Sequence, residues 1–286
     1  MITVSAKDTS QQQFHGFLLG AIGPRPIAFA STIDKEGRPN LAPFSFFNVF
    51  SSNPPIAIFS PARSGRDGIN KHTLDNVKEV PEVVLNVVNY NMVQQMSLTS
   101  SPYTKGVDEF EKAGFIKLAS QQIKPFRVAE APVTMECKVN QVIELGQSGG
   151  AGNLVVCEVL LIHVKEEVLD EQGKIDTQKI DLVARMGGNW YCRAHGDALF
   201  EVAKPITTLG IGVDAIPVEI RNSKVLSGNN LGQLGNVEHL PTAEEISAYK
   251  NSLNKRFANA EECHQFAKTL LDVNKVNEAW KVLLGN

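Results

Sequence analysis

PIAFASTI, residues 26–33, is followed by DKEG at 34–37 and then by a second extended segment, residues 38–49. Two extended runs separated by a four-residue turn that ends in glycine predict a β-hairpin. Further apolar runs follow at residues 55–60 and 82–89, and the second of these is apolar on both faces. A strand that is apolar on both faces is buried on both sides, so residues 82–89 are expected to form a central strand.

Two long strand-like segments follow, at residues 132–145 and 153–165, and the glycine-rich tract GQSGGAG at 146–152 connects them. Short helices are expected at 67–80 and 91–99. Strands at short spacing, without regular alternation of strand and helix, favour a barrel over a doubly wound sheet. We therefore expect residues 1–200 to form one mainly β domain.

The last part of the chain changes character. Thr242 and Glu245 fit a capping box, Asn259 and Glu262 repeat it, and apolar residues recur at helical spacing after each and again from Val276. We expect residues 201–286 to be a loop and helical extension. Its apolar stripes should pack on the barrel or on a second subunit.

Composition excludes several classes of protein. The chain has 286 residues, 43% hydrophobic and 21% charged, with a net charge of −3. That composition disfavours disorder and a basic nucleic-acid binder, and no apolar run is long enough to cross a membrane. The four cysteines form no CxxC pair and the six histidines show no metal-ligand spacing, so we expect a reducing cytoplasm and no metal.

One glycine motif resembles a dinucleotide-binding fingerprint. Residues 210–215, GIGVDA, fit G-x-G-x-x-A, but Pro217 follows at once. A dinucleotide site needs a helix that begins at the motif and points its N-terminus at a pyrophosphate. We expect that no such helix starts here and that the glycines form a tight turn.

Two segments have ligand-like chemistry. Residues 42–55 mix phenylalanines with Ser and Asn on consecutive positions, which suits a flat heteroaromatic ligand with apolar faces and a polar edge. Taken alone, the simpler interpretation is a strand that ends in a polar loop. Residues 60–76 gather arginines, a lysine, hydroxyls and glycines before a possible helix, as a phosphate site requires. A solvated charged loop is the alternative.

These segments belong to a longer pattern. GPRPIAFAST at 23–32, Gly37 and Asn40-Leu-Ala-Pro-Phe-Ser45 lead into Asn48, Asn53-Pro-Pro55 and Ser60. Lys71-x-Thr73-x-x-Asn76, Asp108-Glu-Phe110, Ala131-Pro-Val133 and Arg185-x-Gly187 with Tyr191 follow in order. The pattern resembles the flavin reductase-like family of FMN-binding split barrels, flavoredoxin included, over roughly residues 15–195.

The resemblance implies a six-stranded antiparallel split barrel of Greek-key type and a homodimer with one FMN per subunit near the interface. It implies that the isoalloxazine ring lies along Phe44–Phe50 and that Tyr103 and Phe110 cover the nicotinamide. The implied FMN-binding residues are Phe44, Ser45, Asn48, Val49, Phe50, Ser60, Arg63, Lys71, Thr73, Arg185 and Tyr191. His72 stands where the family often has an acidic residue, and no catalytic side chain is assigned.

Two functions follow from the resemblance. The first is an FMN reductase that passes hydride from NADH or NADPH to the flavin N5 and electrons onward to an unidentified acceptor. The second is a flavoredoxin-like protein that holds flavin and transfers electrons, with little turnover of NAD(P)H. A third function, that of a split-barrel oxidase acting on pyridoxamine phosphate, is disfavoured because the segments resemble the reductase branch more closely.

Overall fold

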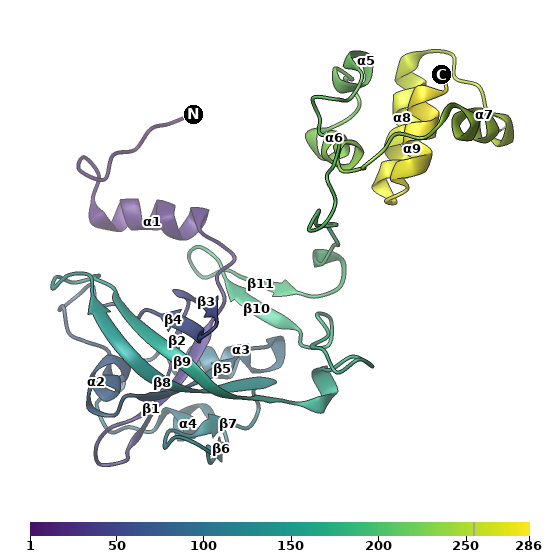
Figure 1. Cartoon of the computed structure of the whole chain (residues 1–286). Helices are drawn as coiled ribbons and strands as arrows, with labels where there is room; N and C mark the ends of the chain where they lie inside the picture. Colours follow the sequence, from purple (N-terminus) through teal and green to yellow (C-terminus); the bar gives the residue numbers. More distant parts are fainter. Residues whose placement is uncertain (254) are drawn as a thin grey trace. The chain divides into compact units, whose positions relative to one another are not determined.

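The computed structural model describes residues 1–253 and 255–286 and divides into two compact units, Met1–Phe200 and Glu201–Asn286. The first unit contains every strand assigned among the described residues, and the second is helical (Figure 1). No helix among the described residues is long and apolar enough to cross a membrane. No three His, Cys, Asp or Glu side chains gather as a metal site in the described ranges.

The predicted hairpin is confirmed. Strands β1 (Ala28–Ile33) and β2 (Pro39–Phe44) pair antiparallel, with Ile33 opposite Pro39, and Gly37 closes the turn at a φ of 79°. Every residue of β1 is buried, because β5 (Glu82–Val87) pairs with its other edge. The central position predicted for residues 82–89 is confirmed as well, since β5 lies between β1 and β8.

The large sheet has the order β2-β1-β5-β8-β9-β4-β3, which is seven strands rather than the six expected. The strand number differs because one extended segment is interrupted at residues 45–46 and is therefore counted as two strands. Strands β2 and β3 (Phe47–Ser52) are consecutive in the chain, yet they occupy opposite ends of the sheet order, beside β1 and beside β4 (Pro55–Phe59). A single extended segment, residues 39–52, therefore serves both ends of the sheet, as the closing strand of a six-stranded barrel does.

Strands β8 (Val133–Glu144) and β9 (Asn153–Val164) form the long hairpin predicted on either side of the glycine-rich tract. Two register shifts, at Glu136/Cys137 and at Val139/Gln141, mark bulges that increase the local twist. One apolar core lies inside the sheet around Phe59, Leu85 and Val155. A second packs Phe29, Leu41 and Met96 under the small helices.

Helices decorate the barrel. The segment predicted at 67–80 is helical only as α2 (His72–Glu79), because residues 65–67 form a turn. The segment predicted at 91–99 forms η1 (Tyr90–Met92) and α3 (Val93–Leu98), and α4 (Glu109–Ala113) follows. The helix α1 (Gln11–Ala21) was not predicted, although Phe14, Phe17, Leu18 and Ala21 recur at helical spacing and the Ser10 hydroxyl caps the helix through the Gln13 N–H.

Short elements complete the first unit. Strand β6 (Lys117–Leu118) pairs with β7 (Arg127–Val128), and β10 (Leu182–Arg185) pairs with β11 (Tyr191–Ala194). Two 3₁₀ turns, η2 (Glu166–Val168) and η3 (Gly196–Ala198), lie in the connecting chain.

The second unit contains the three predicted helices, α7 (Ala243–Ser252), α8 (Ala260–Asp272) and α9 (Val276–Leu284). The capping box of Thr242 and Glu245 is present, and Asn259 caps α8 through the N–H of Glu262. Two short helices, α5 (Val218–Arg221) and α6 (Gly228–Gly235), precede them and were not predicted. Helix α5 begins at Val218 with Pro217 as its N-cap residue, so it starts after the glycine motif and not at it.

The core of this unit forms around Trp280, which is fully buried and whose indole N–H donates to the Leu234 carbonyl at 3.0 Å. The glycines of residues 210–215 belong to this packing. A Cβ at Gly210 would lie 2.5 Å from the carbonyl oxygen of Gly235, and Gly212 has a φ of 82°. The motif is therefore a tight turn against the end of α6, as predicted.

Candidate functional site

The site begins at the interruption between β2 and β3. Ser45 and Phe46 belong to neither ladder, because the β1 pairing ends at Phe44 and the β4 pairing begins at Phe47. Their backbone groups are therefore released from the sheet at the point where the barrel closes. The Phe46 carbonyl accepts a hydrogen bond from the Ser60 N–H at 2.8 Å, which ties this interruption to the start of the loop at residues 60–71.

That loop packs on the glycine-rich turn between β8 and β9. The Ser60 hydroxyl accepts from the Asn153 N–H, and the Asn153 amide donates to the Pro61 carbonyl at 2.8 Å. The backbones of Arg63 and the turn also pair, through Arg63 N–H to Ala151 and Gly150 N–H to Arg63. Gly149 approaches so closely that a Cβ would lie 3.0 Å from the Ser64 carbonyl. Glycine is required there because two backbones meet.

Arg63 lies inside this arrangement. One of its terminal nitrogens donates to Glu144 at 3.2 Å and to Gln147 at 3.1 Å. Its Nε is buried and has no hydrogen-bond partner among the described residues, and the same is true of the side-chain oxygens of Asn70 and Asn153. Buried polar atoms without partners are uncommon, and here three of them gather around one loop. Glu144 also binds Lys78, and these hydrogen bonds lower the Glu144 pKa to about 2.

Helix α2 begins at the end of the loop. Lys71 is its N-cap residue and is exposed, and no side chain caps the helix. The first backbone N–H groups of a helix have no partner within it. Thr73 differs from its expected role: its hydroxyl is buried and donates to the Asn40 side chain at 2.8 Å, so it fixes α2 to β2. What this position offers a ligand is the helix N-terminus rather than the hydroxyl.

Arg25 is the residue that sequence reasoning missed. Its Nε donates to the Ser45 hydroxyl at 3.4 Å, and its terminal nitrogens donate to the carbonyls of Leu19, Ile22 and Met186. Only 5% of the residue is exposed, and desolvation together with the charge of Arg185 lowers its pKa. The only sequence signal for a role of Arg25 is its position in the GPRP segment at residues 23–26. Its partners Ser45 and Met186 are remote in sequence, so no local pattern reveals these contacts.

Arg185 and Tyr191 lie beside this arginine. The Arg25 and Arg185 backbones exchange two hydrogen bonds, at 2.9 and 2.8 Å. The Arg185 guanidinium stacks over the Tyr191 ring, 4.7 Å from its centroid, across the β10–β11 ladder. The fold thus brings Ser45, Arg185 and Tyr191 together through Arg25, although they are far apart in the sequence.

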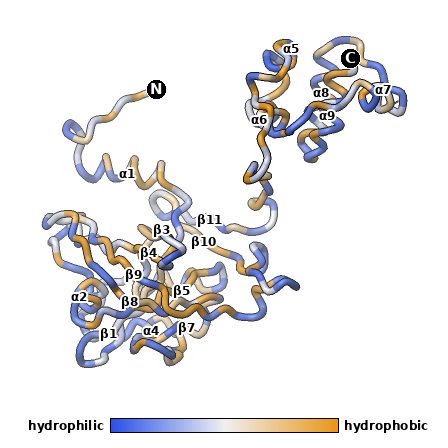
Figure 2. Tube along the Cα trace, in the orientation of Figure 1, coloured by the Kyte–Doolittle hydropathy of each residue, from blue (hydrophilic) through white to orange (hydrophobic). Residues whose placement is uncertain are grey.

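Apolar side chains near the interruption remain uncovered in the single chain. Val49 and Phe50 on β3 are 59% and 65% exposed, Phe46 is 42% exposed, and Trp190 in the β10–β11 turn is 78% exposed. Asn48 is exposed beside them, and its side chain accepts from the Val49 N–H. Phe44 instead packs inward, against Phe59 at a ring separation of 5.6 Å. Helix α1 adds exposed Phe17 and Leu18, the Ile22 that follows it is exposed as well, and Figure 2 marks hydrophobic residues along the helix.

One implied role is wrong. Phe110 was expected to cover a nicotinamide, but its side chain is fully buried in the core beneath the small helices. Tyr103 is half-buried on the preceding loop, with the Lys112 ammonium 5.9 Å from its ring centroid. Because Phe110 forms part of a core cluster, it supports the loop rather than a ligand.

A buried carboxyl lies behind the site. Glu109 is 4% exposed and accepts from the Leu41 N–H at 3.0 Å. Burial raises its pKa, although hydrogen bonds from Leu41 and Asn40 oppose that shift. This carboxyl holds β2 against α4 close to the contact between Thr73 and Asn40.

Comparison with known proteins agrees with this arrangement. A family model described as "Flavin reductase like domain" matches residues 21–180. An uncharacterized protein of Aquifex aeolicus is 35% identical over 196 residues, which cover 68% of this chain and 97% of the relative. Nitrilotriacetate monooxygenase component B from Bacillus cereus superposes with a TM-score of 0.66 at 29% identity, covering 71% of this chain and 98% of that one.

More distant solved structures show the same fold. A split-barrel protein from Shewanella frigidimarina has 24% identity and a TM-score of 0.60, covering 71% of this chain and all of that one. Flavoredoxin of Desulfovibrio vulgaris has 20% identity and a TM-score of 0.54, covering 65% and 93%. The barrel, its closing strand and the family match agree, and the chain belongs to the flavin reductase-like domain family with a split-barrel fold.

Proposed function

We propose that the chain is an FMN-binding flavin reductase that takes hydride from NADH or NADPH and passes electrons to an acceptor. The family supports flavin-binding oxidoreductase chemistry, and the nicotinamide donor is part of the proposal. The observation that carries it is the junction of Ser45–Phe46 with the loop at 60–71, where a released backbone segment adjoins a cationic loop and an uncapped helix.

The residues present fit FMN. A phosphate suits the buried and unpartnered Nε of Arg63, the exposed Lys71 and the N-terminus of α2, because each supplies donors to an anion. The released backbone at Ser45 and Phe46, with Asn48 nearby, suits the polar edge of the ring. The exposed side chains of Val49 and Phe50 suit its apolar face.

When bound, FMN supplies the hydride-accepting and electron-transferring chemistry. The chain's own part is to bind, orient and stabilise charge. Arg185 lies close enough to Arg25 for burial and the Arg185 charge to lower the Arg25 pKa, and two neighbouring guanidinium groups favour the additional negative charge of a reduced flavin. Arg25 also fixes Ser45, so the ring's polar edge meets a rigid backbone.

An absorbance titration tests the proposal. Purified protein should bind FMN, and anaerobic NADH or NADPH should bleach the flavin band. A protein that binds FMN but oxidises neither nucleotide would instead support the flavoredoxin-like alternative. Failure to bind FMN at all would contradict both functions.

We also propose a homodimer. Monomeric proteins rarely expose a large contiguous apolar patch, and here Val49, Phe50 and Phe46 are exposed around one strand while all of α1 is unburied. Phe50→Asp should shift sedimentation toward the monomer, because it places a charge among those side chains. Val273→Asp, a similarly exposed apolar site in the second unit, serves as the control.

The reducing cytoplasm remains the proposed location. All four cysteines are free thiols in the structure, and burial raises the pKa of the Cys137 thiol to about 12. Buried thiols with a high pKa are poor nucleophiles, so no redox role is proposed for this cysteine.

A further inference from the structure

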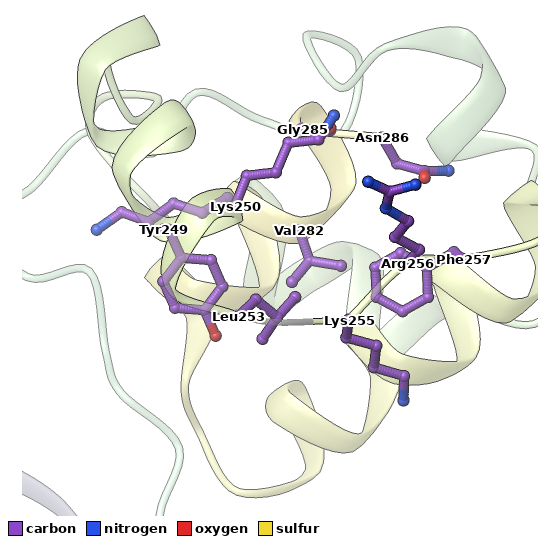
Figure 3. Close-up of a pocket in the computed structure, with 10 residues that line it drawn as sticks. Tyr249, Lys250, Leu253, Lys255, Arg256, Phe257, Val282, Gly285 and Asn286 are labelled. Carbon is purple, nitrogen blue, oxygen red and sulfur yellow. The ribbon is translucent and has the colours of Figure 1, made fainter.

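A cavity lies within the helical unit, independent of the proposed flavin site. It is about 360 Å³ in volume and opens between the end of α7, residues 255–257 and the end of α9 (Figure 3). That volume falls within the usual range for sites that hold a small molecule. The residues that line it are Tyr249, Lys250, Leu253, Lys255, Arg256, Phe257, Lys281, Val282, Gly285 and Asn286.

The rim of this cavity is cationic. Four of the lining residues are lysine or arginine, and no lining side chain is Asp or Glu. None of these four cations takes part in an ion pair among the described residues. The Lys250 ammonium donates to the Gly285 carbonyl at the end of α9, so that charge already has a partner. The Arg256 and Lys281 side chains have no hydrogen-bond or ion-pair partner among the described residues, and Lys255 lies over an aromatic ring.

The inside of the cavity is apolar and aromatic. Leu253 and Val282 lie at its centre, and the Phe257 ring lies beside them (Figure 3). Phe257 packs against Phe266 at a ring separation of 5.6 Å, and the Lys255 ammonium lies 4.2 Å from the Phe266 centroid. The aromatic pair thus holds a cation at the edge of the hollow. Glu278 faces Tyr249 and, together with burial, raises its phenol pKa, but Glu278 does not line the cavity.

From this arrangement we propose that the cavity binds a small organic anion with an apolar or aromatic body. The anionic group is held at the rim by Arg256, while Lys255 and Lys281 add positive charge around the cavity, and the body rests on Leu253, Val282 and Phe257. A purely apolar ligand leaves the Arg256 guanidinium without a partner, and an inorganic anion leaves the apolar floor exposed to water. Aromatic carboxylates and nucleoside phosphates both have the required chemistry.

Calorimetric titration of the full chain as purified, without added FMN, distinguishes these two sources. The probes are 2-naphthoate and ADP, and their neutral counterparts are 2-naphthamide and adenosine. At least one anion should bind at least tenfold more tightly than its neutral counterpart, and its affinity should fall as salt is raised. Whichever anion binds identifies the source. Absence of binding by both at 1 mM, or equal binding of the neutral compounds, overturns the proposal.

Variants locate the binding. Lys255→Gln with Arg256→Gln should weaken the anion at least tenfold, whereas Lys224→Gln, an exposed lysine of the same unit outside the cavity, should not. Both variants are made in a Trp190→Phe background, where they should keep the FMN absorbance and the fluorescence of the buried Trp280, which shows that both units remain folded. Unchanged anion affinity in the double variant with intact fluorescence assigns the anion elsewhere and refutes the site. Because the titration does not involve flavin turnover, its outcome is separate from that of the proposed function.

Discussion

In the proposed site, Arg63 is the residue expected to contribute most to binding of the FMN phosphate. Its Nε is buried without a partner, while Arg66 in the same loop is exposed. We expect Arg63→Gln to raise the Kd for FMN roughly tenfold to hundredfold, because a charge-assisted hydrogen bond contributes about 1.5–3 kcal/mol. Fluorescence quenching titrations would measure this loss.

Riboflavin provides the internal control for that experiment, because it lacks the phosphate. Its affinity should be the same in the parent and in Arg63→Gln, and Arg66→Gln should leave FMN affinity nearly unchanged. Equal weakening of FMN and riboflavin by Arg63→Gln would show that the arginine supports the loop rather than the phosphate.

Glu109 predicts a pH dependence of stability. Burial raises its pKa in the folded state above the value in the unfolded chain, about 4.3. The folded state therefore binds more protons, and this contribution to the free energy of unfolding is lost as pH rises from the unfolded pKa through the folded pKa. Glu109→Gln removes the titration. The variant's free energy of unfolding minus the parent's should increase from pH 4 to pH 7.

Urea unfolding at several pH values measures this difference. Altered hydrogen bonding of the glutamine adds an offset, but that offset does not vary with pH. Glu111→Gln, on the exposed side of the same helix, is the matched control for the substitution itself. A flat difference for Glu109→Gln would contradict the raised pKa.

At the scale of elements, the hairpin turn and α1 offer a matched pair of glycines. A Cβ added at Gly37 or at Gly16 would meet no atom within 4 Å, but only Gly37 has a positive φ, 79°. Both positions have room for a methyl group, so backbone conformation determines the effect of an alanine substitution on stability. Gly37→Ala should destabilise the barrel by about 1–2 kcal/mol, because an L-residue is strained there.

Gly16→Ala should act in the opposite direction. Gly16 lies inside α1, where alanine is favoured by about 0.5–1 kcal/mol in an exposed helix. Chemical denaturation followed by circular dichroism would compare the two variants. A destabilised Gly16→Ala would mean that α1 makes a close contact at this position in the assembled protein.

The same scale explains which elements could be predicted. Strand β5 is apolar on both faces and α7 begins with a capping box, and both signals are local, so both predictions are confirmed. Helix α1 also has local signals, an N-cap at Ser10 and apolar residues at helical spacing, and it was missed because residues 1–15 are mainly polar. The helix α6 contains glycines at both ends and one inside, which local propensity disfavours.

At the scale of the whole molecule, the two units are expected to respond separately to mutation. Gly210→Ala should destabilise the helical unit, because its Cβ would lie 2.5 Å from the Gly235 carbonyl, and it should leave FMN binding nearly unchanged. The chain has two tryptophans, and Trp280 is fully buried in the helical core. In a Trp190→Phe background, Trp280 fluorescence therefore reports the unfolding of that unit alone.

The free energy of unfolding reported by Trp280 should fall by about 2–4 kcal/mol in Gly210→Ala. A rigid backbone contact cannot move away from the added methyl group without loss of stability. Gly228→Ala in the same unit has open space and is the control. Loss of FMN binding in step with the Trp280 signal would instead show that the two units fold cooperatively.

The sequence by itself determined the mainly β class, the hairpin around Gly37, the central strand β5 and the capped helices, because turn chemistry and hydrophobic periodicity are local. It also indicated Ser45 and Arg63 through the order of motifs. Only the tertiary structure decided that residues 39–52 divide at Ser45 to serve both ends of the sheet, and that Arg25 joins Ser45 to Arg185. Barrel closure and buried hydrogen bonds link residues that are remote in sequence, so no local pattern encodes them.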